Sequence, residues 1–341
     1  MRHSTSAAAK TMTIGVDLGD CNSQVCVLDV DGNVLETGKI ATTPSSMSKR
    51  IGSCDRARVA LEAGTHSAWV SRLLREFGHE TFVANPRQLR LIPGNVRKSD
   101  RADAEALARV ARIDPKLLAP IQHRGPSAQL HLSALRTRDA LVAARTKLVN
   151  HARGAVKAFG HRLPCCSANS FHRKAAESLP DGIRAALSEV LEVIAVLTSK
   201  IGQFDRDIER VCRRVYPETQ LLRQVAGVGP VTALTFVLTL EDPERFRHSR
   251  TVGAYVGLIP KTSASGKRDP ELQITKAGDS ALRRLLVTAA HYVVGPFGPE
   301  TDLRRWGLSL AARGRKNAKK RAIVAVARKL AVLLHHVWRT G

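Results

Sequence analysis

The chain has 341 residues, of which 54 are Lys or Arg and 30 are Asp or Glu, so its net charge is +24. This excess favours a partner with many phosphates, because each neutralised phosphate releases a counterion. An anionic membrane surface is the competing partner, but the sequence has no lipid-anchor motif and no run of about 18 apolar residues. Aromatic residues make up only 4%, so we do not expect base stacking to dominate nucleic-acid binding.

The length and the cysteine content indicate a multidomain protein of the reducing cytoplasm. A chain of 341 residues predicts two domains, or two domains and a connecting element. Six cysteines without a C-x-x-C pair indicate neither disulfides nor structural zinc. Residues 1–10 lack the apolar core of a signal peptide and are expected to form a loose tail.

Residues 11–125 alternate between strand and helix patterns. Strands are expected at 12–17, 24–30, 34–40, 59–62 and 80–84, with a hairpin turn at 31–33. Helices are expected at 67–77 and 100–112, the second with Ser99 as its N-cap. A strand meander followed by alternating strands and helices predicts a mixed sheet covered by helices, an α/β fold.

Residues 126–217 have the apolar spacing of long helices. Apolar residues alternate at intervals of four and three, which is a heptad seam typical of a coiled coil. The seam consists of Ile183, Leu187, Val190, Ile194, Leu197, Ile201, Phe204, Ile208, Val211 and Val215. Leu135, Val142, Val149 and Val156 follow at intervals of seven on an earlier helix, and 160–170 is the expected turn. The two helices either pair as an intramolecular hairpin or form an oligomerisation stalk.

Residues 218–341 are punctuated by glycine, then helical, and rich in basic side chains. Ten Lys and Arg residues lie between Arg304 and Lys329, and 323–337 has helical spacing. Such a run is either a solvated helix face or a phosphate-contacting helix.

Four acids of the first region form a candidate metal site. Asp17 and Glu62 end buried strands, and Asp100 and Asp103 lie three apart on one helix face. Like charges close together are costly unless a cation lies between them, and Mg²⁺ prefers oxygen ligands and phosphate oxygens. The combination predicts phosphodiester chemistry with Mg²⁺. Each acid alone could equally be a turn residue or a helix-dipole partner.

The same N-terminus permits a rival interpretation. Gly15 to Gly19, followed by Asn22 and Ser23, resembles the phosphate-binding hairpin of sugar kinases and actin-like ATPases. An ATPase of that kind needs a second glycine-rich phosphate loop, and we find none in the first 160 residues. The net charge is also unexplained by ATP binding.

Two segments of the last region are candidates for contact with phosphates. Residues 222–233, with Gly227 and Gly229, have the pattern of a helix-hairpin-helix that binds the DNA backbone, or of a plain packing corner. Residues 261–268 place Ser265 beside Gly266 in a lysine-rich loop, where a hydroxyl could form a phosphoester. The remaining basic candidates for DNA contact are Lys261, Lys267, Arg268, Lys276, Arg283 and Arg284.

Together these segments resemble the DEDD-type insertion-sequence transposases of the IS110 family, over nearly the whole chain. The resemblance rests on Gly15-Val16-Asp17, Leu61-Glu62, residues 98–104 (KSDRADA), Gly227-Val228-Gly229, residues 257–260 (GLIP), Ser265-Gly266-Lys267 and residues 274–284 (ITKAGDSALRR). The 98–104 and 274–284 runs are the most specific.

The resemblance implies a RuvC-like, RNase H-like domain at 11–125 with Asp17, Glu62, Asp100 and Asp103 as its acids, a coiled-coil region and a C-terminal transposase domain. It implies that Ser265 is the nucleophile. Ala264 stands where the family usually has a further serine, and Ser263 is the alternative. It also implies a structured guide RNA, the bridge RNA, that pairs with donor and target DNA.

The sequence therefore predicts a recombinase in which Mg²⁺ and Ser265 cut and rejoin double-stranded DNA. The acids and the serine lie in different domains, so the active site could assemble between protomers of a homodimer or homotetramer. Three alternatives stay open. They are a junction-cleaving metal nuclease with an idle serine, an actin-like ATPase and a non-catalytic nucleic-acid scaffold.

Overall fold

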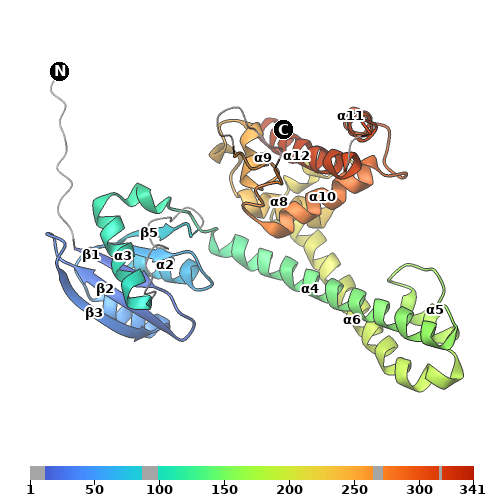
Figure 1. Ribbon diagram of the computed structural model, residues 1–341, viewed down its shortest axis with the longest axis horizontal. Coiled ribbons are helices and arrows are strands. Elements are labelled where there is room, and N and C mark those ends of the chain that lie inside the picture. Colours follow the sequence, from blue (N-terminus) through green and yellow to red (C-terminus); the bar gives the residue numbers. More distant parts are fainter. Residues whose placement is uncertain (1–11, 87–98, 264–271, 315–316) are drawn as a thin grey trace. The chain divides into compact units, whose positions relative to one another are not determined.

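The computed structural model describes residues 12–86, 99–263, 272–314 and 317–341 (Figure 1). The expected N-terminal tail, 1–10, lies outside these residues. The chain divides into two compact units, Met1–His123 and Arg124–Gly341. No helix in the described ranges is long and apolar enough to cross a membrane.

The first unit is built on a mixed sheet. Its described strands are β1 (Thr13–Asp17), β2 (Asn22–Leu28), β3 (Val34–Ala41), β4 (Arg58–Glu62) and β5 (Glu80–Ala84), in the order β3-β2-β1-β4-β5. β1 pairs antiparallel with β2 and parallel with β4, and β4 pairs parallel with β5. The predicted mixed sheet is confirmed, and this order of strands is that of an RNase H-like domain.

The predicted strand at 24–30 lies two residues earlier, because Asp29 begins the turn. Its Oδ1 accepts hydrogen bonds from the backbone N–H groups of Asp31 and Asn33, both at 2.8 Å. A side chain that binds its own backbone in this way ends the strand and tightens the hairpin. The side-chain amide of Asn33, which donates to Asp29 Oδ2 at 3.0 Å, and these backbone hydrogen bonds lower the pKa of the Asp29 carboxyl below its ordinary value.

Helices cover both faces of the sheet. The described α-helices of this unit are α1 (Pro44–Met47), α2 (Ser67–Glu76) and α3 (Asp100–Ile113), and it also has a short π-helix, η1 (Ser48–Gly52), and a 3-10 helix, η2 (Pro115–Leu118). Val70 and Leu74 of α2 pack with Ile14 and Val16 on one face. Successive strand residues point to opposite faces, so the other face, which α3 covers, carries the residues between them.

The second unit is helical in its described part. Its long helices are α4 (Pro126–Ala155), α6 (Asp181–Arg214), α8 (Pro230–Leu240), α10 (Ser280–Val294), α11 (Asp302–Ala311) and α12 (Ala318–Thr340). Shorter elements are η3 (Val156–Phe159), α5 (Phe171–Glu177), α7 (Thr219–Leu222), η4 (Pro243–Arg245), η5 (Ser249–Thr251) and α9 (Val252–Tyr255). The main core lies between α8, α10 and α12.

α4 and α6 pack against each other as an intramolecular hairpin, which is one of the two arrangements that the sequence left open (Figure 1). The buried side of α6 differs from the predicted seam, because Leu191 and Cys212 are buried whereas Val190 and Val211 are only half-buried. The reason is the choice of partners. α6 packs on α4 at both ends, and it also packs on α5 at one end and on Leu234 and Leu238 of α8 at the other, so its buried side is wider than a seam for one partner helix.

A buried polar trio lies between the two long helices. Arg145 of α4 is only 8% exposed, and its Nη1 donates to Asn169 Oδ1 at 2.9 Å and to Thr198 Oγ1 at 3.4 Å. No carboxylate among the described residues forms an ion pair with it, and burial lowers the pKa of its guanidinium. Asn169 belongs to the connection between the helices and Thr198 to α6, so the trio joins three segments.

Candidate active site and nucleic-acid interface

Asp17 and Glu62 lie side by side at the ends of parallel strands. The register pairs Val16 of β1 with Leu61 of β4, so the next residue on each strand is one of these acids. Neighbouring strands lie about 4.8 Å apart. The structure therefore brings together two acids that are 45 positions apart in sequence, at the carboxyl edge of the sheet.

Both acids are on the face that α3 covers. Asp17 is two residues after Gly15, so both point to the same face. A Cβ on Gly15 would overlap the carbonyl oxygen of Ala104 in α3. Glu62 shares its face with Ala60, which packs against Leu107 of α3.

The first turn of α3 lies at the same edge. The guanidinium of Arg58, at the start of β4, donates to the carbonyl of Ala111 near the end of α3 at 3.1 Å. The helix therefore runs antiparallel to β4, and its N-terminus lies toward the carboxyl ends of the strands. Ser99 caps this end, as predicted, by accepting from the N–H of Ala102 at 3.3 Å. Asp100 is exposed and Asp103 is half-buried in this first turn.

The chemistry of this donor set fits a divalent cation. All four candidates are carboxylates, which are hard oxygen ligands, and each is at least partly exposed. Among the described residues, no three His, Cys, Asp or Glu side chains lie close enough together to hold a metal ion, so the structure brings Asp17 and Glu62 together but does not gather three of the four acids into one group. Three such side chains are not required for Mg²⁺, which is usually held by one or two carboxylates together with water and substrate phosphates.

In the second unit, two short segments pair in antiparallel fashion on either side of the predicted serine loop in the sequence. We call these segments, 259–261 and 273–276, the neck. Pro260 and Ile274 form an antiparallel bridge, Lys261 N–H donates to Gln273 O at 2.9 Å, and Thr275 N–H donates to Ile259 O at 2.9 Å. Lys261, Ser263 and Lys276 are exposed on this neck. Ser265, Lys267 and Arg268 lie outside the described residues.

Residues 274–284 form part of the neck and the beginning of α10. Asp279 accepts from the N–H groups of Ala281 and Leu282 at 3.0 and 2.9 Å and caps the helix. Arg283 donates to the carbonyls of Val256 and Ala277, at 3.1 and 2.7 Å, and so ties α10 to the neck. Arg284 forms an ion pair at 2.6 Å with Asp139 of α4.

The predicted glycine hairpin is a tight turn between α7 and α8. Gly227 has φ +82°, and a Cβ there would lie 2.9 Å from the carbonyl oxygen of Ala289 in α10. Gly229 is the N-cap of α8 and has open space around it. A hollow of about 440 Å³ lies beside this turn and is lined by both glycines and by Thr288 and Tyr292 of α10.

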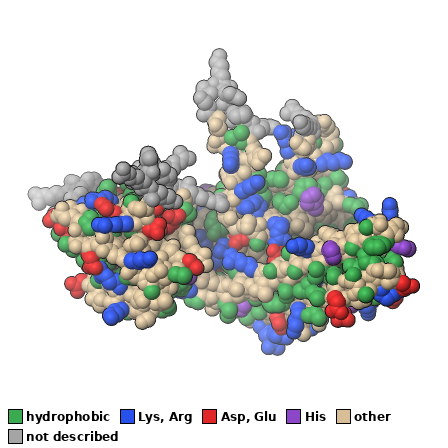
Figure 2. Space-filling view, turned by 60° about the horizontal axis from the view of Figure 1, so that its bottom comes forward, with side chains coloured by type: hydrophobic (Ala, Val, Ile, Leu, Met, Phe, Trp, Pro, Cys, Tyr) green, Lys and Arg blue, Asp and Glu red, His purple; other side chains and the backbone are tan. Residues whose placement is uncertain are grey.

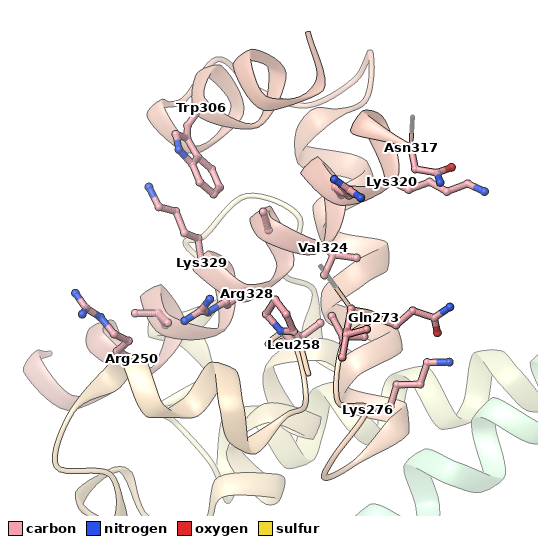
Figure 3. A pocket seen from close by; sticks show the side chains of 16 residues that line it. Arg250, Leu258, Gln273, Lys276, Trp306, Asn317, Lys320, Val324, Arg328 and Lys329 are labelled. Carbon is pink, nitrogen blue, oxygen red and sulfur yellow. The ribbon is translucent and has the colours of Figure 1, made fainter. Parts of the chain in front are cut away.

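Sequence reasoning did not identify a larger pocket of about 1000 Å³ beside the neck (Figure 3). Arg250, Trp306, Lys320 and Arg328 are among its lining residues. The basic run 304–329 was the available signal, but spacing alone could not tell which of its side chains turn inward. Lys and Arg side chains are spread widely over the helical unit on the face seen in Figure 2.

An RNase H-like sheet with acids at its carboxyl edge, followed by a basic helical unit, defines an enzyme that processes nucleic-acid strands. A family model described as a transposase, of the DEDD type of IS110, matches residues 14–160. A model described as the transposase IS116/IS110/IS902 family matches residues 219–303.

Related proteins extend this match over most of the chain. A probable family 20 transposase of Pseudomonas aeruginosa is 30% identical over 285 residues, covering 81% of this chain and 82% of that protein. The transposase for insertion sequence element IS1111A of Coxiella burnetii is 27% identical over 333 residues, covering 94% and 88%. The transposase for element IS1328 of Yersinia enterocolitica is 28% identical, covering 81% and 82%.

The chain belongs to the IS116/IS110/IS902 family of transposases. It is an enzyme of insertion-sequence transposition that cleaves and transfers DNA strands. The DEDD type of its N-terminal domain implies a divalent metal, which agrees with the carboxylate donors at the edge of the sheet.

Proposed function

We propose that this transposase cuts and rejoins DNA with Mg²⁺ held by Asp17, Glu62, Asp100 and Asp103 and with Ser265 as the nucleophile. The metal site is supported by the parallel register of β1 and β4, which pairs the strand ends that carry Asp17 and Glu62, and by the antiparallel course of α3, whose first turn carries Asp100 and Asp103. We assign the metal site to residues 11–125, a coiled-coil arm to 126–217 and the serine chemistry to 218–341.

The reaction that we propose is a transesterification. The Ser265 hydroxyl oxygen bonds to the scissile phosphorus as the bond from phosphorus to one DNA oxygen breaks, and the released DNA hydroxyl takes a proton. After strand exchange, a DNA hydroxyl attacks the phosphoserine and restores the serine. A bound divalent ion would neutralise the phosphate oxygens and favour a deprotonated attacking oxygen. Lys261 and Lys276, exposed on the neck, would bind the same phosphate, together with Lys267 and Arg268.

Contacts with the DNA backbone are assigned to the turn between α7 and α8, which we interpret as a helix-hairpin-helix. Its support is the open N-terminus of α8 at Gly229 and the positive φ of Gly227, features that suit an approaching phosphate. Arg284 contributes charge at the surface, whereas the hydrogen bonds of Arg283 favour a role in positioning α10. A structured guide RNA would select the DNA sequence, and the net charge of +24 suits such a partner.

Covalent trapping tests the serine mechanism. The protein is incubated with Mg²⁺, labelled donor DNA and RNA transcribed from the flanks of its element, and denaturation-resistant adducts are measured. We expect an adduct with the wild type and with Ser263→Ala, and none with Ser265→Ala or Asp17→Asn. Metal-dependent cleavage that persists unchanged in Ser265→Ala, without an adduct, would establish the alternative of a RuvC-like junction endonuclease.

We also propose that α6 mediates assembly into a homodimer or homotetramer. Val193 and Val196 lie three residues apart on α6 and are 49% and 59% exposed, although the helix already packs on α4. The double substitution Val193→Glu with Val196→Glu is expected to lower the molecular mass seen by analytical ultracentrifugation. Val215→Glu, at an equally exposed valine after the helix, is the control. An unchanged mass in the double variant would contradict this assembly.

A further inference from the structure

The pocket of about 1000 Å³ beside the neck lies between α12 and residues of the segments 258–260 and 272–276 (Figure 3). Trp306 of α11 stands at one end of it, and Gln273 and Lys276 stand toward the other. Pro260 and Ile274, which form the bridge of the neck, are also lining residues. The pocket therefore adjoins the neck, whose two described segments precede and follow the proposed nucleophile in the sequence.

Its lining combines an apolar floor with a basic rim. Leu258, Ile274, Val324 and Val332 are apolar lining residues, which are called the floor below. The basic lining residues, called the rim, are Arg250, Lys276, Lys320, Arg321, Arg328 and Lys329, and none of the described lining residues is Asp or Glu. This lining favours a ligand with an apolar body and at least one negative charge.

Two of the lining side chains are held in place before any ligand binds. The ammonium of Lys329 lies 4.0 Å from the centroid of the Trp306 ring, a cation–π contact that fixes the ring. The aliphatic stem of Arg328 packs on the backbone at Gly253, where a Cβ would lie 3.0 Å from Cγ of Arg328. Such preorganisation reduces the entropy lost on binding.

We propose that this pocket binds an unpaired nucleotide of a single DNA strand, with its base against the floor and Trp306 and its phosphates on the basic rim. A base in a duplex is stacked and paired and cannot reach such a floor, whereas an unpaired base can stack on an aromatic ring. The proposal rests on the proposed function, because strand exchange leaves unpaired nucleotides. The pocket would hold the exchanging strand next to the neck.

The test uses the full-length Ser265→Ala protein without metal, so that binding is measured apart from chemistry. Fluorescence anisotropy gives the affinity for a 12-nucleotide DNA strand, for its duplex and for the RNA of the same sequence. The double variant Lys320→Gln with Arg328→Gln is expected to weaken strand binding about tenfold. It should also lower the slope of log K against log salt by about one for each lost phosphate contact.

Lys319→Gln is the matched control, because Lys319 is exposed, adjacent to Lys320 and not a lining residue. It removes one charge from the same helix turn and should leave the affinity for the strand unchanged. A strand carrying one 5-iodouracil is then irradiated, and the crosslinked peptide is identified by mass spectrometry. We expect the crosslink at Trp306 with the single strand and not with the duplex.

Crosslinks elsewhere, or equal strand affinity in the pocket variant and the wild type, would overturn the proposal. So would tighter binding of the RNA strand with the same dependence on Lys320 and Arg328, because the occupant would then be RNA. If the trapping experiment shows no covalent adduct with Ser265, these binding results are unaffected, because they are measured without metal in Ser265→Ala. The two proposals can therefore fail separately.

Discussion

Replacing Gly15 by alanine is expected to destabilise the first unit by about 3 kcal/mol or more and to abolish strand cleavage. The new methyl group would overlap the carbonyl oxygen of Ala104 and lie 2.7 Å from the backbone nitrogen of Ala108. Both obstacles are main-chain atoms of α3, so no side-chain rotation relieves them. The helix must move off the sheet, and Asp100 and Asp103 move with it.

Peptide-resolved hydrogen exchange measures this effect where it arises, because a chain with two units need not unfold in one step. We expect faster exchange in α3 and in β1, and unchanged exchange in α12. Gly64→Ala is the control, since Gly64 has no heavy atom within 4 Å of the added Cβ. If α3 in Gly15→Ala exchanges as slowly as in the wild type, the packing of the helix on the sheet does not require glycine at position 15.

Asp17→Asn or Glu62→Gln is expected to lower the rate of metal-dependent DNA cleavage by about 10²- to 10³-fold. Each substitution removes one negative charge from the adjacent strand ends while keeping the shape of the side chain. Single-turnover cleavage is measured over a range of Mg²⁺ and Mn²⁺ concentrations, and Mn²⁺ binding is measured directly by electron paramagnetic resonance. Weaker Mn²⁺ binding should accompany the slower cleavage.

Asp20→Asn is the control for the metal site. Asp20 is close to Asp17 in sequence, but its side chain is 95% exposed and lies 3.5 Å from the ring of His66. Cleavage and Mn²⁺ binding should be unchanged in this variant. The double variant Asp17→Asn with Glu62→Gln should be little slower than either single one, because the two acids act as a unit. Fully additive losses would argue against a shared ion.

Local patterns in the sequence predicted the elements of the first unit well. Alternating residues, the hairpin turn near 31–33 and the cap at Ser99 are decided within a few positions, so strands and α3 lie close to where they are expected. The order of the strands could not be predicted in the same way. It depends on parallel pairing between β1 and β4, whose residues are about 45 positions apart.

The second unit shows where sequence patterns are insufficient. Arg283 belongs to a basic helix, and its guanidinium donates to two carbonyls of a neighbouring segment, contacts that the spacing of basic residues does not predict. Lys320 lines a pocket and Lys319 does not, although both have the same local composition. The direction of such side chains is decided by tertiary packing. The shift of the buried side of α6 to Leu191 and Cys212 has the same cause.

The buried polar trio of Arg145, Asn169 and Thr198 fixes the alignment of α4 against α6. A slip by one heptad would place apolar residues against apolar residues again, and would move the helices by about 10 Å. It would also take Arg145 away from both of its acceptors and leave a charged group buried without hydrogen bonds, which is strongly unfavourable. The trio thereby fixes the offset of α4 along α6, and this offset determines the length of the helical hairpin.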